Sequence, residues 1–252
     1  MLNLHLCGSG SRFASPSVRG DLQDRQNPIG ASLARLLLGA MVVFGSWSGS
    51  ALAQNESAIG KQTSPATKPA WKKLLPDDGL EGWEKTNFGG EGEVRNEKGI
   101  LTFETGEPLT GITKLGKDFP TENFEMEWSA QRIEGSDFFA GVTFPVGKEH
   151  CSFICGGWGG GLIGISSIDG NDASENETAK HRDFKNGKWY KFKVRVDAKN
   201  ISVWIDEDQI IEVSRGNRKF SVRAEVMRSR PLGYCVFQSK VAVKDWVYRT
   251  IE

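Results

Sequence analysis

An alternation of apolar and charged residues with a period of two is the feature that most restricts what this chain can fold into. Residues 124–128 read Phe-Glu-Met-Glu-Trp, and residues 190–196 read Tyr-Lys-Phe-Lys-Val-Arg-Val. Because successive side chains of a strand point to opposite faces, each of these segments buries one face and exposes the other. No long segment follows the 3.6-residue period of an amphipathic helix. The pattern therefore predicts an all-β protein.

Similar segments recur at spacings of about ten residues, with turn-forming residues between them. Residues 201–205 and 210–213 flank Asp-Glu-Asp-Gln, and residues 94 and 100–103 flank Asn-Glu-Lys-Gly, so both pairs are expected hairpins. Further strands are expected at residues 138–144, 151–155, 162–166, 221–226, 232–237 and 241–248. Many short strands with one apolar face each predict a two-sheet antiparallel β-sandwich of the jelly-roll type.

The first part of the chain has the composition of an export signal. Arg35 precedes an apolar run at residues 36–44, and Ala51-Leu52-Ala53 ends a stretch of small residues. The run is shorter than the about 20 apolar residues that a membrane-spanning helix needs. We therefore expect a signal peptide with an extended n-region at residues 1–53, a flexible linker at 54–70 and a jelly-roll domain at 71–252. Cleavage near Ala53 predicts a secreted or periplasmic protein without stable membrane insertion.

The charge balance and the cysteines restrict partners and cross-links. Thirty-two basic residues balance thirty-two acidic ones, which argues against a nucleic-acid partner. Cys151 and Cys155 lie four residues apart on an expected strand, hence about 13 Å apart, too far for a disulfide. Either cysteine could pair with Cys235 across a sheet, or all three could be buried free thiols.

Several segments, in order, carry a family resemblance. They include Asp-Gly-Leu-Glu-Gly-Trp at 78–83, Asn-Phe-Glu-Met-Glu-Trp at 123–128, Gly-Lys-Trp-Tyr at 187–190, Ile-Ser-Val-Trp-Ile-Asp at 201–206 and Val-Lys-Asp-Trp at 243–246. The region 74–251 resembles the 3-keto-disaccharide hydrolase domains of bacterial exported proteins, and residues 144–178 resemble a planctomycete-like subgroup. The resemblance implies a concanavalin A-like (laminin-G-like) jelly roll that cleaves the glycosidic bond of a 3-keto sugar.

The densest polar cluster follows one of the expected strands, at residues 166–178, and ends near His181. Its carboxylates and amides suit sugar hydroxyls, a hard cation or acid–base work on a glycosidic bond. The alternative is a solvated loop with an internal network of Asx turns. The catalytic candidates are Asp172, Glu175, Glu177 and His181, and the candidates for carbohydrate binding are Trp158, Asn171, Asn176 and Arg182.

Trp158 lies within Gly-Gly-Trp-Gly-Gly-Gly, at residues 156–161. Glycine neighbours would leave the indole face free to stack on a sugar ring; alternatively, the glycines mark a close approach of strands and the tryptophan is part of the core. Glu125 and Glu127 share one strand face about 7 Å apart, and we interpret them as a polar sheet surface rather than a glycosidase pair.

A divalent cation such as calcium is a candidate cofactor, but no metal ligand is assigned. The spacing Asp169, Asn171, Ala173 departs from the EF-hand loop, because alanine cannot supply the third oxygen. Three functions remain open. The chain cleaves a 3-keto sugar or related glycoside, with a base that removes the proton at C2, or it is a non-catalytic carbohydrate-binding or cell-surface module. In both of these cases the partner is a small saccharide or glycan. The third alternative is a structural laminin-G-like partner domain, which predicts neither a catalytic cleft nor a sugar-binding surface.

Overall fold

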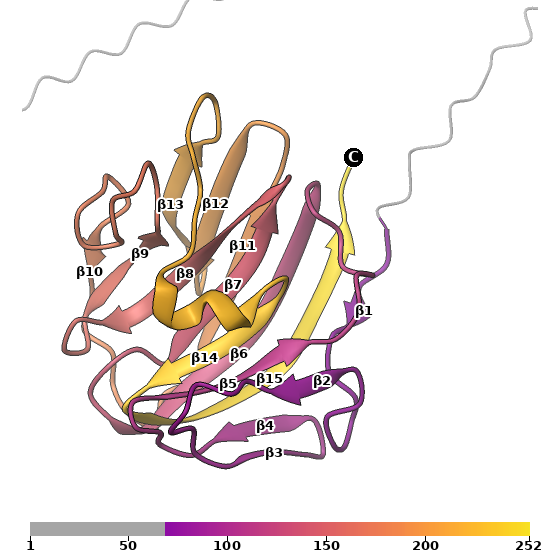
Figure 1. Ribbon diagram of the computed structural model, residues 1–252, viewed down its shortest axis with the longest axis vertical. Helices are drawn as coiled ribbons and strands as arrows, with labels where there is room; N and C mark the ends of the chain where they lie inside the picture. The colour runs from indigo at the N-terminus through magenta and orange to yellow at the C-terminus, as the bar shows by residue number, and fades with distance from the viewer. Residues whose placement is uncertain (1–68) are drawn as a thin grey trace, which may run out of the picture. The chain divides into compact units, whose positions relative to one another are not determined.

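The computed structural model describes residues 69–252. The expected signal peptide at 1–53 and most of the expected linker at 54–70 lie outside the described residues. Within 69–252 the strands form two antiparallel sheets (Figure 1). No helix in this part of the chain has the length and apolar character that crossing a membrane requires.

The first sheet has eight strands. In spatial order they are β13 (Asp208–Ser214), β12 (Asn200–Ile205), β11 (Tyr190–Val196), β6 (Phe124–Gly135), β15 (Ser239–Thr250), β4 (Ile100–Phe103) and β3 (Val94–Glu97), with β1 (Lys72–Lys73) paired to β15. The second sheet has seven strands. They are β10 (Lys180–His181), β9 (Leu162–Ser166), β8 (Glu149–Gly157), β7 (Ala140–Val146), β14 (Gly233–Phe237), β5 (Leu109–Lys114) and β2 (Trp83–Lys85).

The core lies between the sheets and is built from the alternating apolar positions. Trp128 of β6 and Phe192 of β11 stack with ring centroids 5.3 Å apart. The edge of Trp128 meets Tyr234 of the second sheet, whose hydroxyl donates a hydrogen bond of 2.8 Å to the carbonyl of Phe139. Edge-to-face aromatic packing and a satisfied phenol are the usual way to bury such rings. The all-β, two-sheet antiparallel sandwich of the jelly-roll type, predicted by the period-two alternation, is confirmed.

The outer face of the first sheet is polar. Glu125 accepts hydrogen bonds from Arg249 at 2.5 and 2.8 Å and lies 3.5 Å from Arg195. Glu127 pairs with Lys191 at 2.9 Å. Both glutamates therefore neutralise basic residues on neighbouring strands, as the sequence interpretation of a polar sheet surface requires.

The second sheet is buried on both faces at its centre, where the sequence predicts one buried side. All seven residues of β7 are buried. A stretch that we name the cover segment, residues 219–230, lies across the outer face and contains the short 3-10 helix η1 (Ala224–Ser229), drawn in gold over β14 in Figure 1. The space under the cover segment is tight: Cys235 packs against Val226 there, and a Cβ added to Gly141 would lie only 3.0 Å from the sulfur of Cys235.

The strand predicted at residues 221–226 is wrong, because this stretch forms the first part of the cover segment. Val222 and Val226 both pack on a small cluster that contains Leu109 and Cys235. Val222 precedes η1 and Val226 lies within it. Residues an even number of positions apart also share one face of a strand, so the same two valines fit the strand that the sequence predicts.

The three cysteines in the described residues, Cys151, Cys155 and Cys235, are buried and free. Burial raises the pKa of the Cys235 thiol to about 12, and it also raises the pKa of the Cys151 and Cys155 thiols. Of the two alternatives left open by the sequence, three buried free thiols is the one found.

Candidate functional site

A pocket of about 270 Å³ opens on the outer face of the second sheet, beside the cover segment. Its apolar wall consists mainly of Phe138, Phe237, Ile154 and Val226, together with the indole of Trp158. Its polar groups are Asp137, Ser152, Ser166, Arg223 and Glu225. An apolar and aromatic wall with a few convergent polar groups is the usual composition of a small-molecule site.

Arg223 binds two carboxylates, one in the pocket and one behind it. Its guanidinium donates to the Glu225 carboxylate through Nη2 at 2.9 Å and through Nε at 3.3 Å. Nη1 donates to Asp172, and the guanidinium carbon lies 5.8 Å from the centre of the Trp158 ring. These contacts use three of the five N–H groups of the side chain, which leaves two available to a ligand. Hydrogen bonding from Arg223 lowers the pKa of the Glu225 carboxyl, so Glu225 is ionised at neutral pH.

The turn between β8 and β9 holds Trp158 at the pocket. Trp158 has a φ of 50° and is 48% exposed. Asp137 fixes this turn, because its carboxylate accepts hydrogen bonds from the backbone N–H of Gly159 at 3.0 Å and of Phe138 at 2.7 Å. Of the two interpretations of the glycine-rich segment, the structure therefore has the tryptophan at the surface and not in the core.

Arg132 supports the same turn from below. It is buried, and its guanidinium donates to the carbonyls of Asp137 and Phe184 at 3.0 Å each and to the amide oxygen of Asn186 at 2.7 Å. A buried arginine that binds carbonyls from two loops fixes their relative position. The buried side chain of Arg132 thus fixes the position of Asp137 at the pocket.

Asp172 lies directly behind the pocket. Its carboxylate accepts hydrogen bonds from the hydroxyl of Ser166, from the side chain of Arg223 and from the backbone N–H of Ala173. Two of these partners, Ser166 and Arg223, line the pocket. Asp172 can therefore orient Arg223, although it is not itself part of the lining.

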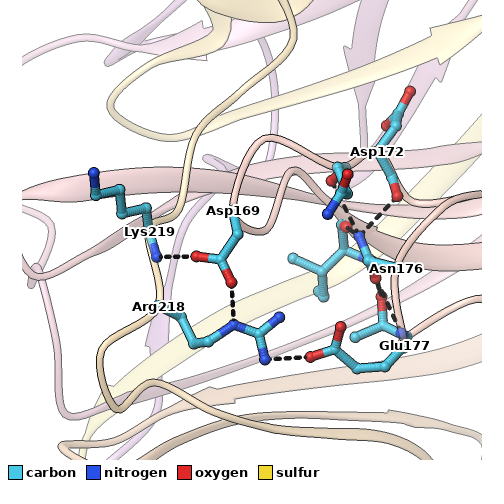
Figure 2. Close-up of polar contacts among 9 residues, drawn as sticks. Asp169, Asp172, Asn176, Glu177, Arg218 and Lys219 are labelled. Atoms are coloured by element: carbon cyan, nitrogen blue, oxygen red, sulfur yellow. Dashed lines mark hydrogen bonds and ion pairs between the residues drawn. The ribbon is translucent and has the colours of Figure 1, made fainter.

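Asn176 ties the polar loop together. Its side-chain amide donates to the carbonyls of Ile165, Asn171 and Asp172 at 2.8, 3.2 and 2.8 Å. Its amide oxygen accepts from the backbone N–H and the hydroxyl of Thr178, at 3.0 and 2.5 Å. The amide points into the loop rather than toward solvent (Figure 2). This is the internal network that the sequence allowed as the alternative to a site.

Glu177 lies on another side of the same loop. It pairs with Nη1 of Arg218 at 2.5 Å, and Nε of Arg218 donates to Asp169 (Figure 2). Asp169 also accepts from the backbone N–H of Lys219 at 2.8 Å. Arg218 lowers the pKa of the Glu177 carboxyl, as the backbone hydrogen bond from Lys219 does for Asp169. This ion-paired cluster anchors the start of the cover segment.

The other expected site residues do not line the pocket. Glu175 and Asn171 are exposed on the polar loop, and His181 is exposed on the edge strand β10. Arg182 lies 3.4 Å from Asp206 and packs over the ring of Tyr190. The structure thus brings Trp158 and Asp172 to the pocket and leaves the remaining six residues outside its lining.

The donor set does not fit a bound cation. Among residues 69–252, no three His, Cys, Asp or Glu side chains converge on one point. Asp169 and Glu177 both bind Arg218, and Asp172 and Glu225 both bind Arg223, so the carboxylates of each pair are directed at a guanidinium rather than at a common cation position.

Sequence reasoning missed Asp137, Ser152, Arg223 and Glu225. Arg223 and Glu225 alternate with Val222 and Val226 in the sequence. This alternation marks two charged residues on one side of the segment, but by itself it predicts a strand. Asp172 and Arg223 are 51 residues apart in the sequence, and only the crossing of the cover segment brings them into contact.

Residues 70–252 match the family model of the 3-keto-alpha-glucoside-1,2-lyase-like domain. No curated protein matches the chain. Three solved structures with similar architecture are an endo-acting O-glycanase of the human gut microbiota, the carbohydrate binding module CBM66 of Bacillus subtilis and a beta-1,3-1,4-glucanase from a mouse hindgut metagenome.

The O-glycanase is 11% identical, with a TM-score of 0.49 and coverage of 74% of this chain and 100% of that chain. The binding module is 11% identical, with a TM-score of 0.43 and coverage of 67% and 96%. The glucanase is 9% identical, with a TM-score of 0.45 and coverage of 72% and 98%.

Proposed function

The chain belongs to the family of 3-keto-alpha-glucoside-1,2-lyase-like domains, and from that premise we propose that the pocket beside the cover segment cleaves the glycosidic bond of a 3-keto glucoside. The domain is thus of a carbohydrate-active type. The observation that carries the proposal is the contact between Arg223 and Glu225 in this pocket. The guanidinium of Arg223 binds the ionised carboxylate of Glu225 and still has two N–H groups free to bind a ligand.

The 3-keto group makes the proton at C2 acidic. We assign Glu225 as the base that removes this proton, because Arg223 holds it in the ionised form. The electron pair moves onto the oxygen at C3, and the free N–H groups of Arg223 stabilise the resulting negative charge. The enolate then expels the oxygen at C1, which takes a proton from solvent. The products are an unsaturated keto sugar and a free alcohol, and later addition of water completes a net hydrolysis.

The remaining groups bind and orient the sugar. The exposed indole of Trp158 offers a flat apolar face to the ring, and the hydroxyls of Ser152 and Ser166 can bind its polar edge. Asp172 is a positioning residue, because it acts on the sugar only through Arg223. The competing assignment is the one expected from the sequence, with catalysis on Asp172, Glu175, Glu177 and His181.

A non-catalytic binding module is the second candidate, and one observation favours it. Arg223 and Glu225 have exposed fractions of 42% and 55%, so water reaches both groups and weakens the electrostatic stabilisation of an enolate. A pocket of this kind could hold a saccharide without cleaving it.

Release of glucose from 3-keto-trehalose, or of fructose from 3-keto-sucrose, by the purified protein tests the proposal. We expect Glu225→Gln and Arg223→Gln to lower kcat at least 100-fold, while the matched control Glu177→Gln, outside the pocket, retains activity. A primary kinetic isotope effect with substrate deuterated at C2 would identify the proton-removal step. Loss of activity in Glu177→Gln or Glu175→Gln but not in Glu225→Gln would favour the competing assignment. Binding without release in the wild type would favour the binding module.

A further inference from the structure

A second compartment also borders Glu225. It has a volume of about 340 Å³ and lies between η1 and the loop that follows β2. Asn87, Phe88 and Gly89 form one wall, and Ala224, Glu225 and Arg228 form the other. Glu225 is the residue that lines both compartments.

Both walls of this compartment are fixed. The carboxylate of Glu91 accepts hydrogen bonds from the backbone N–H of Phe88, Gly89 and Gly90, at 3.2, 2.9 and 3.1 Å, and so holds the loop in one conformation. Arg228 joins the walls, because Nη1 donates to the carbonyl of Asn87 at 3.0 Å. The carbonyl of Arg228 accepts from the hydroxyl of Thr113 at 2.9 Å, which ties η1 to the sheet.

The compartment also carries unused hydrogen-bonding groups. The single side-chain contact of Arg228 in the described residues uses one of its five N–H groups, and no carboxylate of this part of the chain lies within ion-pair distance of it. The Asn87 side chain is exposed, and the Phe88 ring is half-buried. An arginine, an amide and an aromatic ring are the groups that bind sugar hydroxyls and a ring face.

We propose that this compartment holds the leaving group of the reaction, and that Arg228 and Asn87 select a second sugar ring over a small alcohol. The inference rests on the proposed function. If Glu225 removes the proton at C2, the bond from C1 to the leaving oxygen lies one carbon away, next to Glu225. With the keto ring on the Arg223 side, the leaving group extends into the second compartment. Small-molecule sites have volumes of about 300–1,000 Å³, so either compartment alone has room for little more than one ring, whereas both together accept a disaccharide.

The test compares two substrates, 3-keto-trehalose and methyl 3-keto-α-glucoside, which differ only in the leaving group. In the wild-type protein we expect kcat/KM to be at least tenfold higher for the disaccharide. We expect Arg228→Met to lower the ratio of the two kcat/KM values about tenfold, mainly through KM, because hydrogen bonds from a charged group are lost on one side of the cleaved bond alone. Asn87→Ala should lower the same ratio.

Arg230→Met is the matched control, because Arg230 is exposed, its one side-chain hydrogen bond within residues 69–252 goes to the carbonyl of Met227, and it lines neither compartment. It should leave the ratio unchanged. Equal wild-type kcat/KM values for the two substrates, or an equal loss for both in Arg228→Met, would overturn the inference while leaving the proposed function intact.

Cleavage of neither substrate would instead refute the proposed function. In that case calorimetric titration with 3-keto-trehalose decides the inference separately. An unchanged Kd in both Arg228→Met and Asn87→Ala would overturn it, and a weaker Kd confined to these variants would support it. Thermal unfolding of each variant checks that the fold is retained.

Discussion

Replacement of Asn176 by alanine distinguishes a structural role of this side chain from the sugar-binding role expected from the sequence. In the structure the amide donates to three carbonyls and accepts from two groups of Thr178. An amide has two N–H groups, so one of the three donated contacts is shared. The side chain therefore supplies about four effective hydrogen bonds, each worth about 0.5–1.5 kcal/mol.

The half-buried position of Asn176 reduces the total, because water can reach some of the groups that the substitution leaves unpaired. We expect Asn176→Ala to lower the free energy of unfolding by about 2–3 kcal/mol. For a domain of this size, each kcal/mol corresponds to about 2–4 °C in Tm, so Tm should fall by about 4–12 °C.

Urea denaturation monitored by tryptophan fluorescence, together with calorimetry, measures this change. Asn171→Ala is the matched control, because the exposed side chain of Asn171 makes no hydrogen bond within residues 69–252, and its effect should stay within about 0.5 kcal/mol. A stability equal to wild type in Asn176→Ala, combined with a loss of saccharide binding, would refute the reasoning and restore the sequence-based expectation.

Three further predictions follow from the site. Trp158→Ala should weaken saccharide binding about tenfold, as measured by calorimetric titration, with little change in Tm, because the indole is 48% exposed; a large fall in Tm with unchanged affinity would contradict its role as a binding surface. Arg223 lowers the pKa of the Glu225 carboxyl, so activity should be lost only as the pH falls below the ordinary range of a glutamate, and Arg223→Lys, which binds the carboxylate less well, should shift this acid limb of the kcat profile to higher pH; a shift to lower pH would exclude Glu225 as the base. Finally, the buried thiols of Cys151, Cys155 and Cys235 should react with a thiol reagent only at the rate of unfolding, and rapid labelling of the native protein would contradict their burial.

The sandwich could be predicted from the sequence because its signal is local. Phe124, Met126 and Trp128 all face the core, and Glu125 and Glu127 lie on the opposite face with the basic residues that bind them, so the period-two pattern already contains the register. The exception is the cover segment, where Val222 and Val226 pack on the same cluster and fit either a strand or a helical turn. Short amphipathic stretches do not determine their own secondary structure.

The pocket was only partly predictable, because its members come from separate parts of the chain. Trp158 stood out by its glycine neighbours, and Asp172 by its polar loop. Nothing near Asp137 in the sequence indicates that it binds the Gly159 backbone, and Arg223 is recognisable as a site residue only once it lies beside Asp172 and Glu225. The polar loop drew attention by composition, but most of its polar groups satisfy one another.

The residues that form the fold and the residues assigned to the reaction lie on different segments of the chain. Both charged groups assigned to the reaction, Arg223 and Glu225, lie on one short stretch laid over the second sheet, whose strands supply apolar wall residues and two serines to the same pocket. Substitutions in this stretch can change the substrate without disturbing the strand ladders beneath it. Residues 219–230 could therefore be replaced as one unit in an engineered variant. Substitutions in the same residues would let natural relatives with this fold acquire a different substrate specificity.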